Sequence, residues 1–241
     1  MDQQHKLKLR KHFVKLLYGN PVLEGVPRKP VSHAKKIRKV WDSGKYYDFG
    51  IERIFRLFLV ISKLFFPSIY INYLFRNSSY QAQKVAGEVF VVFKTVMPFF
   101  MLYYELWHHS WLFIINIYLL LETYLYIFYK IFVPEHNNQR THKRSLLLLF
   151  LNFFEVIGSF AVIYAAGHFL NKPVSNWVDA LYFSFVTGAT IGYGDFHPVT
   201  SLGKQLVILQ IVSTLAFLIL FFNFFAPRAQ DSGEYVDADN Q

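Results

Sequence analysis

Residues 190–195 read T-I-G-Y-G-D, and they lie between two long apolar stretches, 146–170 and 205–226. Gly192 and Gly194 stand at alternate positions, where they permit backbone angles with φ > 0 that other residues resist. Successive carbonyl groups can then point to one side of the strand. Four such strands around one axis would stack rings of oxygen atoms that replace the water shell of a monovalent cation. Irregular backbone at membrane depth is tolerated only where it lines such a cavity.

The composition indicates that lipid is the main solvent of this chain. Of its 241 residues, 54% are hydrophobic and only 17% are charged, whereas soluble domains have about 45–50% apolar and about 25% charged residues. A spanning helix needs about 20 apolar residues, and five stretches reach that length: 51–75, 85–107, 111–133, 146–170 and 205–226. The chain contains no Cys, which excludes disulfides and a Cys-ligated zinc site. We therefore predict an all-α membrane protein.

Residues 176–189 form a shorter apolar segment directly before the hexapeptide, and they are too few to span a membrane. We expect a short helix here, whose negative C-terminal end would point at the cavity and favour a cation. An apolar stretch, an aromatic short helix, the hexapeptide, residues 198–200 (P-V-T) and a second apolar stretch occur in this order. Together they resemble the pore of the tetrameric potassium-channel family. A glycine turn between two helices is the alternative interpretation of the hexapeptide.

The resemblance covers about residues 146–226 and implies an outer helix, a pore helix, a selectivity filter and an inner helix, which we call the pore module (145–226). It also implies which groups bind K⁺. The ligands would be the Thr190 hydroxyl and four successive backbone carbonyls, those of Thr190, Ile191, Gly192 and Tyr193. Gly194 and Asp195 would shape the outer mouth. Tyr193 would turn away from the axis and pack on aromatic side chains of the pore helix: Trp177, Tyr182 and Phe183.

One chain supplies one filter strand, so the resemblance implies a homotetramer that passes K⁺ as its permeant ion, without a cofactor. Two positions depart from the family pattern. Ala189 stands where a second Thr is common, and Thr214, after Ser213, stands where the inner helix usually has a hinge glycine. Further along that helix, Phe222 or Asn223 would face the axis, where a hydrophobic constriction can act as a gate. Helix packing or lipid contact is the alternative for the Phe residues there.

The family architecture sets the direction of the helices. The filter opens outward, so the outer helix at 146–170 starts in the cytoplasm after a basic linker, 134–144, as the positive-inside rule expects. Residues 85–133 then form a transmembrane hairpin. A fifth span at 51–75 would place residues 1–50 outside the cell, although they hold 12 Lys and Arg against 4 Asp and Glu. That arrangement violates the same rule.

An amphipathic helix resolves this conflict. Within 51–66 the charged side chains fall on one side of a helix, namely Glu52, Arg53, Arg56 and Lys63. We therefore predict an interfacial helix within 51–84 and four spans per subunit, with a five-span, head-out topology as the alternative. Residues 1–50 would form a basic cytoplasmic segment that binds anionic lipid head groups rather than nucleic acid. Residues 227–241 are predicted to be a disordered acidic tail. The protein would be a multi-pass protein of the plasma or bacterial inner membrane, with both termini cytoplasmic.

Lys94, Glu122 and Glu155 lie inside the apolar stretches, at similar predicted depths. Ionisable groups within a membrane are candidates for function, so these three are a candidate sensor that carries a proton and biases gating. Mutual neutralisation is the alternative. His197 is a candidate pH sensor at the outer mouth, with an exposed loop histidine as its alternative. We expect no arginine-ladder voltage sensor, because 111–133 contains a single basic residue.

Three other functions remain open at this point. A weakly selective cation channel would keep the pore but bind K⁺ less specifically. A K⁺ uptake transporter would need four pore repeats in one chain, and this chain shows no internal repeat. A membrane interaction protein would use the basic segment and leave the pore non-conducting. We do not expect an enzyme, because no catalytic constellation such as H-E-x-x-H occurs in the sequence.

Overall fold

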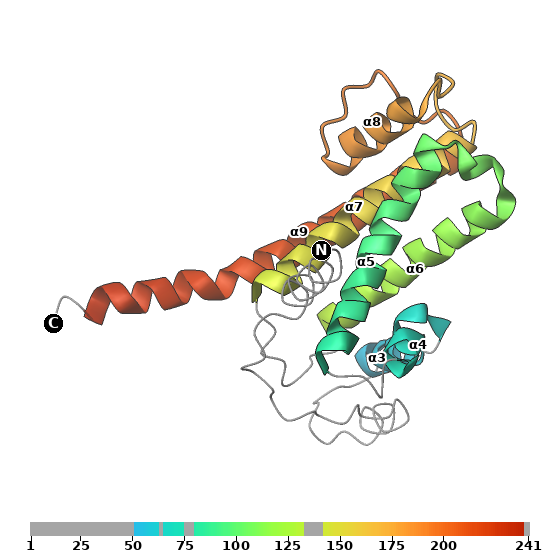
Figure 1. The fold of residues 1–241 in the computed structure, drawn as a ribbon. Helices are drawn as coiled ribbons and strands as arrows, with labels where there is room; N and C mark the ends of the chain where they lie inside the picture. The colour runs from blue at the N-terminus through green and yellow to red at the C-terminus, as the bar shows by residue number, and fades with distance from the viewer. Residues whose placement is uncertain (1–50, 63–64, 75–79, 133–141, 239–241) are drawn as a thin grey trace, which may run out of the picture. The chain divides into compact units, whose positions relative to one another are not determined.

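The computed structural model describes residues 51–62, 65–74, 80–132 and 142–238. Every regular element among these residues is helical (Figure 1). In chain order the elements are α3 (Ile51–Ser62), α4 (Pro67–Leu74), α5 (Tyr80–Tyr103), the short 3₁₀ helix η3 (Leu106–His108), α6 (Ser110–Phe132), α7 (His142–Ala166), α8 (Trp177–Gly188) and α9 (Ser201–Ala238). The predicted all-α fold class is thus confirmed.

Four of the described helices are long and apolar enough to cross a membrane. The candidate spans are Val85–Tyr103, Ser110–Tyr129, Leu146–Ala166 and Ser201–Phe221. Helices α3 and α4 have 12 and 8 residues, fewer than the about 20 that a span needs. The four-span count agrees with the predicted hairpin and pore module, while the interfacial position of 51–84 stays a prediction. The basic segment 1–50 lies outside the described residues.

The chain divides into two compact units, Met1–Phe90 and Val91–Gln241. In the first unit, α3 buries Leu59 and Val60 and leaves Ile51, Ile54 and Phe58 exposed. These exposed residues recur at a spacing of three to four, so one side of α3 presents an apolar stripe. Such a stripe is typical of a helix that lies against lipid.

Helix α7 is the centre of the second unit and contacts α6, α8 and α9 (Figure 1). Its buried residues Val156, Phe160 and Tyr164 form one core cluster with side chains from α6, α8 and α9. On another side, Ala161 and Val162 pack with Met101 and Leu102 of α5. Burial on several sides of one apolar helix is what a central membrane helix requires.

A glycine allows α5 and α7 to approach closely. A Cβ atom on Gly158 of α7 would lie 3.1 Å from the Cβ of Pro98 and 3.1 Å from Cε2 of Phe99 in α5. Pro98 lies inside α5, where its ring prevents the usual hydrogen bond to the carbonyl of Lys94. The contact between Gly158 and Pro98 therefore brings α7 against α5 one turn from the charged residue Lys94.

The C-terminal segment differs from its prediction. Residues 227–241 were predicted to be disordered, but α9 continues as a helix to Ala238. Adding a residue to an existing helix costs far less than nucleating a new one. The polar, acidic composition of this segment opposes burial in lipid, but it does not oppose extension of the inner helix beyond the membrane.

Candidate functional site

Helix α8 begins with a capped N-terminus that sets its starting point. Asn176 is the N-cap, and its Oδ1 accepts a hydrogen bond of 2.9 Å from the backbone N–H of Asp179. The Asp179 carboxylate in turn accepts one of 3.1 Å from the N–H of Ser175. The first of these bonds satisfies an N–H group that the first helical turn leaves unpaired, and the Asp179 carboxylate interacts favourably with the positive end of the helix dipole. The predicted short helix at 176–189 is therefore confirmed as α8.

The end of α8 leads directly into the hexapeptide. The N–H groups of three successive residues, Ala189, Thr190 and Ile191, donate to the carbonyls of Phe185, Thr187 and Val186 at 2.8, 3.1 and 3.0 Å. These bonds hold the first residues of the hexapeptide against the last helical turn. The negative end of the α8 dipole thus lies beside Thr190, where it favours a cation.

Left-handed backbone angles alternate through the hexapeptide. Gly192 and Gly194 have φ of 62° and 83°, and Thr190 has φ of 56°. The two glycine angles confirm what the residue types predict. The angle at Thr190 does not follow from its type, because a β-branched residue resists this region at a cost of about 1–3 kcal/mol. Alternate left-handed residues are the pattern that one-sided carbonyl groups require.

The hexapeptide is exposed along its whole length within one chain. The Ile191 and Tyr193 side chains are 53% and 69% exposed. The contact predicted between Tyr193 and the aromatic residues of the pore helix would therefore need a neighbouring copy of the chain. Within this chain those aromatic residues pack elsewhere: Trp177 on Tyr103, Phe183 on Tyr164 and Tyr182 on Phe196.

The segment after α7 pairs with the segment after the hexapeptide. Asn171 donates from Nδ2 to the carbonyl of Asp195 at 3.2 Å and accepts at Oδ1 from the N–H of His197 at 3.0 Å. The backbone N–H of Asn171 also donates to the carbonyl of His197 at 3.0 Å. His197 is exposed, and its Nδ1 lies 3.3 Å from the carbonyl oxygen of Gly194. Sequence reasoning missed Asn171, whose amide can both donate and accept in a short loop.

Tyr182 links α8 to Asp195 at the end of the hexapeptide. Desolvation, and then a hydrogen bond and the negative charge of Asp195, raise the pKa of Tyr182 above its usual value. The bonds of Asn171 hold the backbone at Asp195 and His197, which fixes this end of the strand.

Comparison with known proteins finds similarity in the region that contains α8, the hexapeptide and most of α7 and α9. Residues 146–231 match the family described as Ion channel. The chain is 37% identical over 78 residues to two-pore potassium channel 4 of Arabidopsis thaliana, a match that covers 32% of this chain and 26% of that protein. The pore module of this chain is thus similar to the pores of potassium channels. No solved structure is significantly similar to the chain.

Two further relatives are also potassium channels. The chain is 36% identical over 50 residues to the hyperpolarization-activated voltage-gated potassium channel of Methanocaldococcus jannaschii, which covers 21% of this chain and 24% of that protein. It is 30% identical over 82 residues to the calcium-gated potassium channel of Thermoplasma volcanium, covering 33% of this chain and 24% of that protein. The chain thus matches about a quarter of the length of these relatives.

A buried polar network holds α8 against both flanking helices, α7 and α9. Gln210 of α9 donates from Nε2 to the carbonyl and the hydroxyl of Ser184 in α8, at 2.8 and 2.9 Å. Its Oε1 accepts from the Tyr164 hydroxyl of α7 at 2.9 Å, and the Ser184 hydroxyl donates to the carbonyl of Ile157 at 2.7 Å. All three polar side chains are 0% exposed. Sequence reasoning missed this network, although a polar residue inside an apolar span such as Gln210 is a signal for it.

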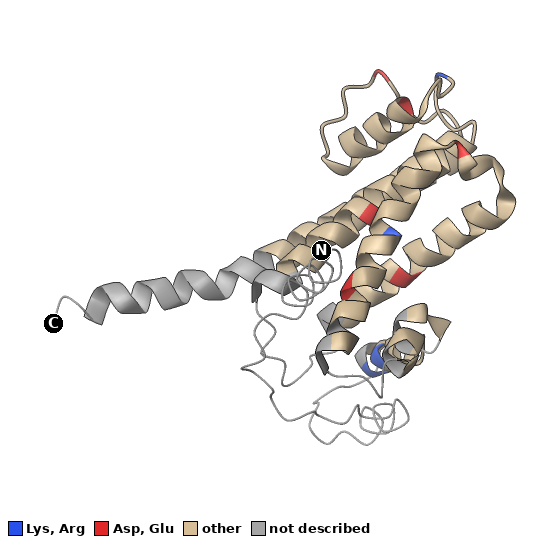
Figure 2. Ribbon diagram, viewed as in Figure 1, with Lys and Arg blue, Asp and Glu red and all other residues tan. Residues whose placement is uncertain are grey.

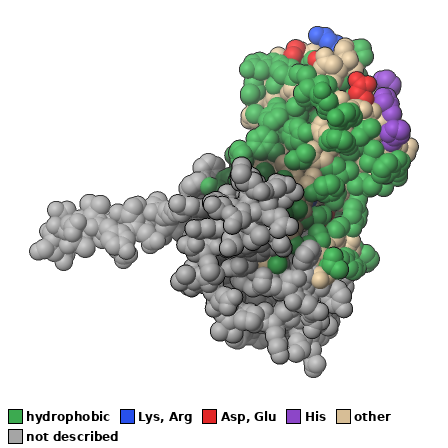
Figure 3. Space-filling model, in the orientation of Figure 1, with side chains coloured by type: hydrophobic (Ala, Val, Ile, Leu, Met, Phe, Trp, Pro, Cys, Tyr) green, Lys and Arg blue, Asp and Glu red, His purple; other side chains and the backbone are tan. Residues whose placement is uncertain are grey.

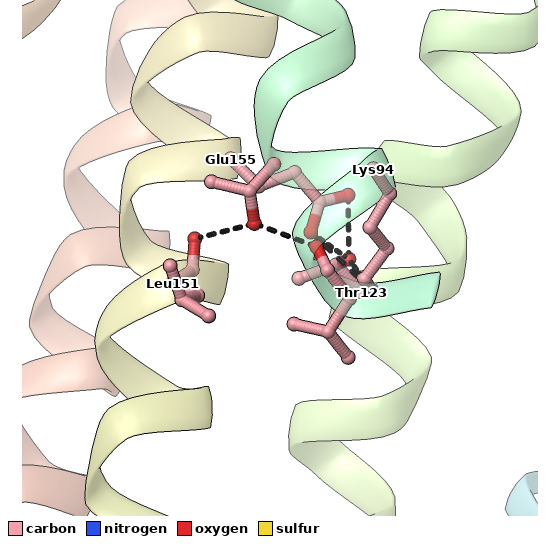
Figure 4. Close-up of polar contacts among 6 residues, drawn as sticks. Lys94, Thr123, Leu151 and Glu155 are labelled. Atoms are coloured by element: carbon pink, nitrogen blue, oxygen red, sulfur yellow. Dashed lines mark hydrogen bonds and ion pairs between the residues drawn. The ribbon is translucent and has the colours of Figure 1, made fainter. Parts of the chain in front are cut away.

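The charged residues predicted to cluster are brought together in part (Figure 4). Lys94 Nζ lies 3.3 Å from Oε2 of Glu155 and donates to Thr123 Oγ1 at 2.6 Å. Thr123 Oγ1 lies 2.9 and 2.8 Å from the two carboxylate oxygens of Glu155. Glu122 is also buried and interacts electrostatically with Glu155. Sequence reasoning found the three charges and missed Thr123, the hydroxyl that bridges two of them.

Figure 2 shows how few charged positions the described helices carry, with some of them in the middle of α5, α6 and α7. Hydrophobic side chains cover most of the described surface in Figure 3, and histidine, acidic and basic side chains gather at one end. Such an arrangement is typical of a membrane protein with one polar end. The predicted gate residues, Phe222 and Asn223, belong to α9, but their side chains lie outside the described part of the structure.

Proposed function

We propose that this chain is one subunit of a homotetrameric channel that passes K⁺ passively through a pore lined by four copies of residues 190–195. The observation that carries the proposal is the alternation of left-handed angles at Thr190, Gly192 and Gly194 directly after a capped pore helix. That backbone allows successive carbonyls to face one axis. The match of the pore module to an ion-channel family and its similarity to potassium channels support the choice of K⁺.

Four copies are proposed because one strand cannot surround an ion. The hexapeptide is exposed within one chain, and three further copies would cover it and complete each ring of oxygen atoms. The ligands of K⁺ would be the Thr190 hydroxyl and the carbonyls of Thr190, Ile191, Gly192 and Tyr193. Gly194 and Asp195 would form the outer mouth, and the 69% exposed ring of Tyr193 would pack on the pore helix of a neighbouring copy.

The proposed topology follows from the same pore. The filter would open outward and both termini would be cytoplasmic, in a plasma or bacterial inner membrane. Residues 51–84 would lie on the inner membrane surface, as the apolar stripe of α3 supports. The basic segment 1–50 would contact anionic lipid head groups. Cleavage of a tag at the N-terminus by a protease added to intact cells would contradict this topology, whereas protection of the tag would support it.

A flux measurement tests the channel function. The purified full chain is reconstituted into liposomes, and K⁺ efflux is compared between wild type, Gly192→Ala and Gly87→Ala. Gly192→Ala should abolish efflux, because its left-handed angle resists a side chain by about 1–2 kcal/mol in every subunit. Gly87→Ala is the matched control, since no atom lies within 4 Å of the added Cβ and its φ is not positive, and it should leave efflux unchanged. Absence of efflux in wild type would contradict the proposal and favour a non-conducting membrane protein.

We also propose that Lys94, Glu122 and Glu155 form a sensor in which a proton on the carboxylates biases gating. Their burial and the short contacts around Glu155 support a direct effect of its charge on the packing of α5, α6 and α7. The other polar group that faces Glu155 is Thr123. Open probability measured against internal pH should change in Glu155→Gln. A pH profile identical to that of wild type would mean that the three charges only neutralise one another.

A further inference from the structure

Helix α9 contains two neighbouring hydroxyl residues in the middle of its membrane span. Ser213 is 4% exposed and Thr214 is 1% exposed, inside the candidate span Ser201–Phe221. Buried polar groups within a membrane are expensive and point to a function. Thr214 also stands where the family resemblance places a hinge glycine, so the inner helix has no glycine at this position.

Both hydroxyls bind back to the helix that carries them. Ser213 Oγ donates to the carbonyl of Leu209, and Thr214 Oγ1 donates to the carbonyl of Ile211 at 2.9 Å. Side-chain bonds of this kind compete with the backbone ladder and often bend a helix. Two of them at successive residues favour bending of α9 at 209–214.

The hairpin reaches α9 at this same point. The Tyr124 hydroxyl of α6 lies 2.5 Å from Ser213 Oγ. A serine hydroxyl has one proton and can accept as well as donate. Since Ser213 donates that proton to Leu209, Tyr124 must be the donor in the contact between the two helices.

The part of α9 nearer the filter is anchored by hydrogen bonds other than the contact with Tyr124. Gln210 binds Ser184 of the pore helix and Tyr164 of the outer helix, three residues before Ser213. The contact with Tyr124 therefore lies at the boundary between a section of α9 that is anchored to the pore helix and the section that continues beyond it. Any bending of the inner helix at 209–214 would change the distance between Tyr124 and Ser213.

Tyr124 is itself positioned by the charged cluster. It directly follows Thr123, whose hydroxyl is bonded to Lys94 of α5 and Glu155 of α7. A rigid helix connects these neighbouring residues, so a shift of α6 against α5 and α7 is transmitted to the Tyr124 hydroxyl. The hydrogen-bonded residues thus form a continuous connection from the hairpin to the inner helix.

We propose that Tyr124 is a positioning residue that couples the transmembrane hairpin to the inner helix at 209–214, and that this contact sets the balance between open and closed pores. The proposal rests on the proposed channel function and assigns a role to the hairpin. Tyr124 touches no permeating ion, so it acts through Ser213 on the position of α9. Loss of its hydroxyl should change gating and leave conductance through the filter intact.

Single-channel recording in planar bilayers tests the coupling with a double-mutant cycle. The variants are Tyr124→Phe, Ser213→Ala, their combination and the control Tyr103→Phe, whose ring is 63% exposed and contacts Trp177. One interhelical hydrogen bond in a membrane changes an equilibrium by about threefold. Tyr124→Phe should shift the ratio of open to closed time by about threefold in wild type and leave it unchanged in the Ser213→Ala background. Tyr103→Phe should leave the ratio unchanged throughout.

The outcomes separate this proposal from the channel function. An unchanged ratio in Tyr124→Phe, or full additivity in the double variant, would overturn the coupling while K⁺ currents persist. A change in unitary conductance or ion selectivity would also overturn it, because that result indicates a distorted filter. If wild type carries no K⁺, the channel function fails, and hydrogen exchange of the amides at 209–217 tests the contact alone. Faster exchange in Tyr124→Phe would support the contact, and unaltered exchange would overturn it.

Discussion

Replacing Tyr164 with Phe should destabilise the protein when Gln210 is present and should not destabilise it when Gln210 is absent. In wild type the Tyr164 hydroxyl donates to Gln210 Oε1 at 2.9 Å, and both residues are fully buried. Tyr164→Phe removes the donor and leaves an amide oxygen unsatisfied. In Gln210→Met the partner is already absent, so Tyr164→Phe removes a buried hydroxyl that lacks its acceptor. Removal of such a group is neutral or stabilising.

The expected loss in the free energy of unfolding follows from the number of hydrogen bonds that Gln210 makes. An interhelical hydrogen bond in a membrane contributes about 0.6 kcal/mol on average and at most about 1.7 kcal/mol. Tyr164→Phe in wild type should therefore cost about 1 kcal/mol. Gln210→Met removes one bond to Tyr164 and two to Ser184, so it should cost about 2–4 kcal/mol once the unpaired Tyr164 hydroxyl is included. Met has nearly the volume of Gln, which limits the contribution of a cavity.

Reversible unfolding in bicelles measures these differences for the purified chain. The free energy of unfolding is compared for wild type, Tyr164→Phe, Gln210→Met and the double variant. We expect the double variant to be as stable as Gln210→Met or slightly more stable. If Tyr164→Phe costs the same free energy in both backgrounds, Gln210 does not accept from Tyr164 and the anchoring of the pore helix needs another explanation.

Three further predictions concern other contacts. Thr123→Val should lower the free energy of unfolding by about 1–3 kcal/mol, because its hydroxyl bonds two charged groups, while Thr123→Ser should keep most of the stability in the same assay. Gly188→Ala should destabilise by about 1–3 kcal/mol, since its Cβ would lie 2.3 Å from the Cδ1 of Ile157, and the double variant with Ile157→Val should recover part of this loss. A positive charge at position 197 of the outer mouth should repel K⁺, so unitary conductance should be lower in His197→Lys than in wild type; equal conductance in the two proteins would reject this role.

The local backbone of the site could be predicted where residue type alone decides it. Gly192 and Gly194 adopt the left-handed angles that glycine permits. Thr190 has the same kind of angle, but a β-branched side chain disfavours it, so sequence reasoning had no basis to expect it. Its position is held by the end of α8 through the bond from its N–H to Thr187. Surrounding structure therefore overrides the preference of the residue.

Contacts between helices could be predicted only where opposite charges lie at similar depths in the membrane. The approach of Lys94 and Glu155 follows from their similar depths, because opposite charges inside a membrane must neutralise one another. The bridge through Thr123 depends on how α6 is rotated, which the spacing of apolar residues does not determine when the helix is apolar on every side. The anchor formed by Gln210 joins helices that are distant in sequence, and its partners are ordinary Ser and Tyr residues.

The reversal potential of the purified channel tests whether four copies of residues 190–195 form a K⁺-selective pore. Currents are recorded in planar bilayers with K⁺ on one side and increasing replacement of K⁺ by Na⁺ on the other. A K⁺-selective pore should give a reversal potential that shifts by about 59 mV for each tenfold change in the K⁺ ratio. A reversal potential that stays near zero under the same gradients would show that the pore does not distinguish K⁺ from Na⁺, and it would rule out the proposed selectivity.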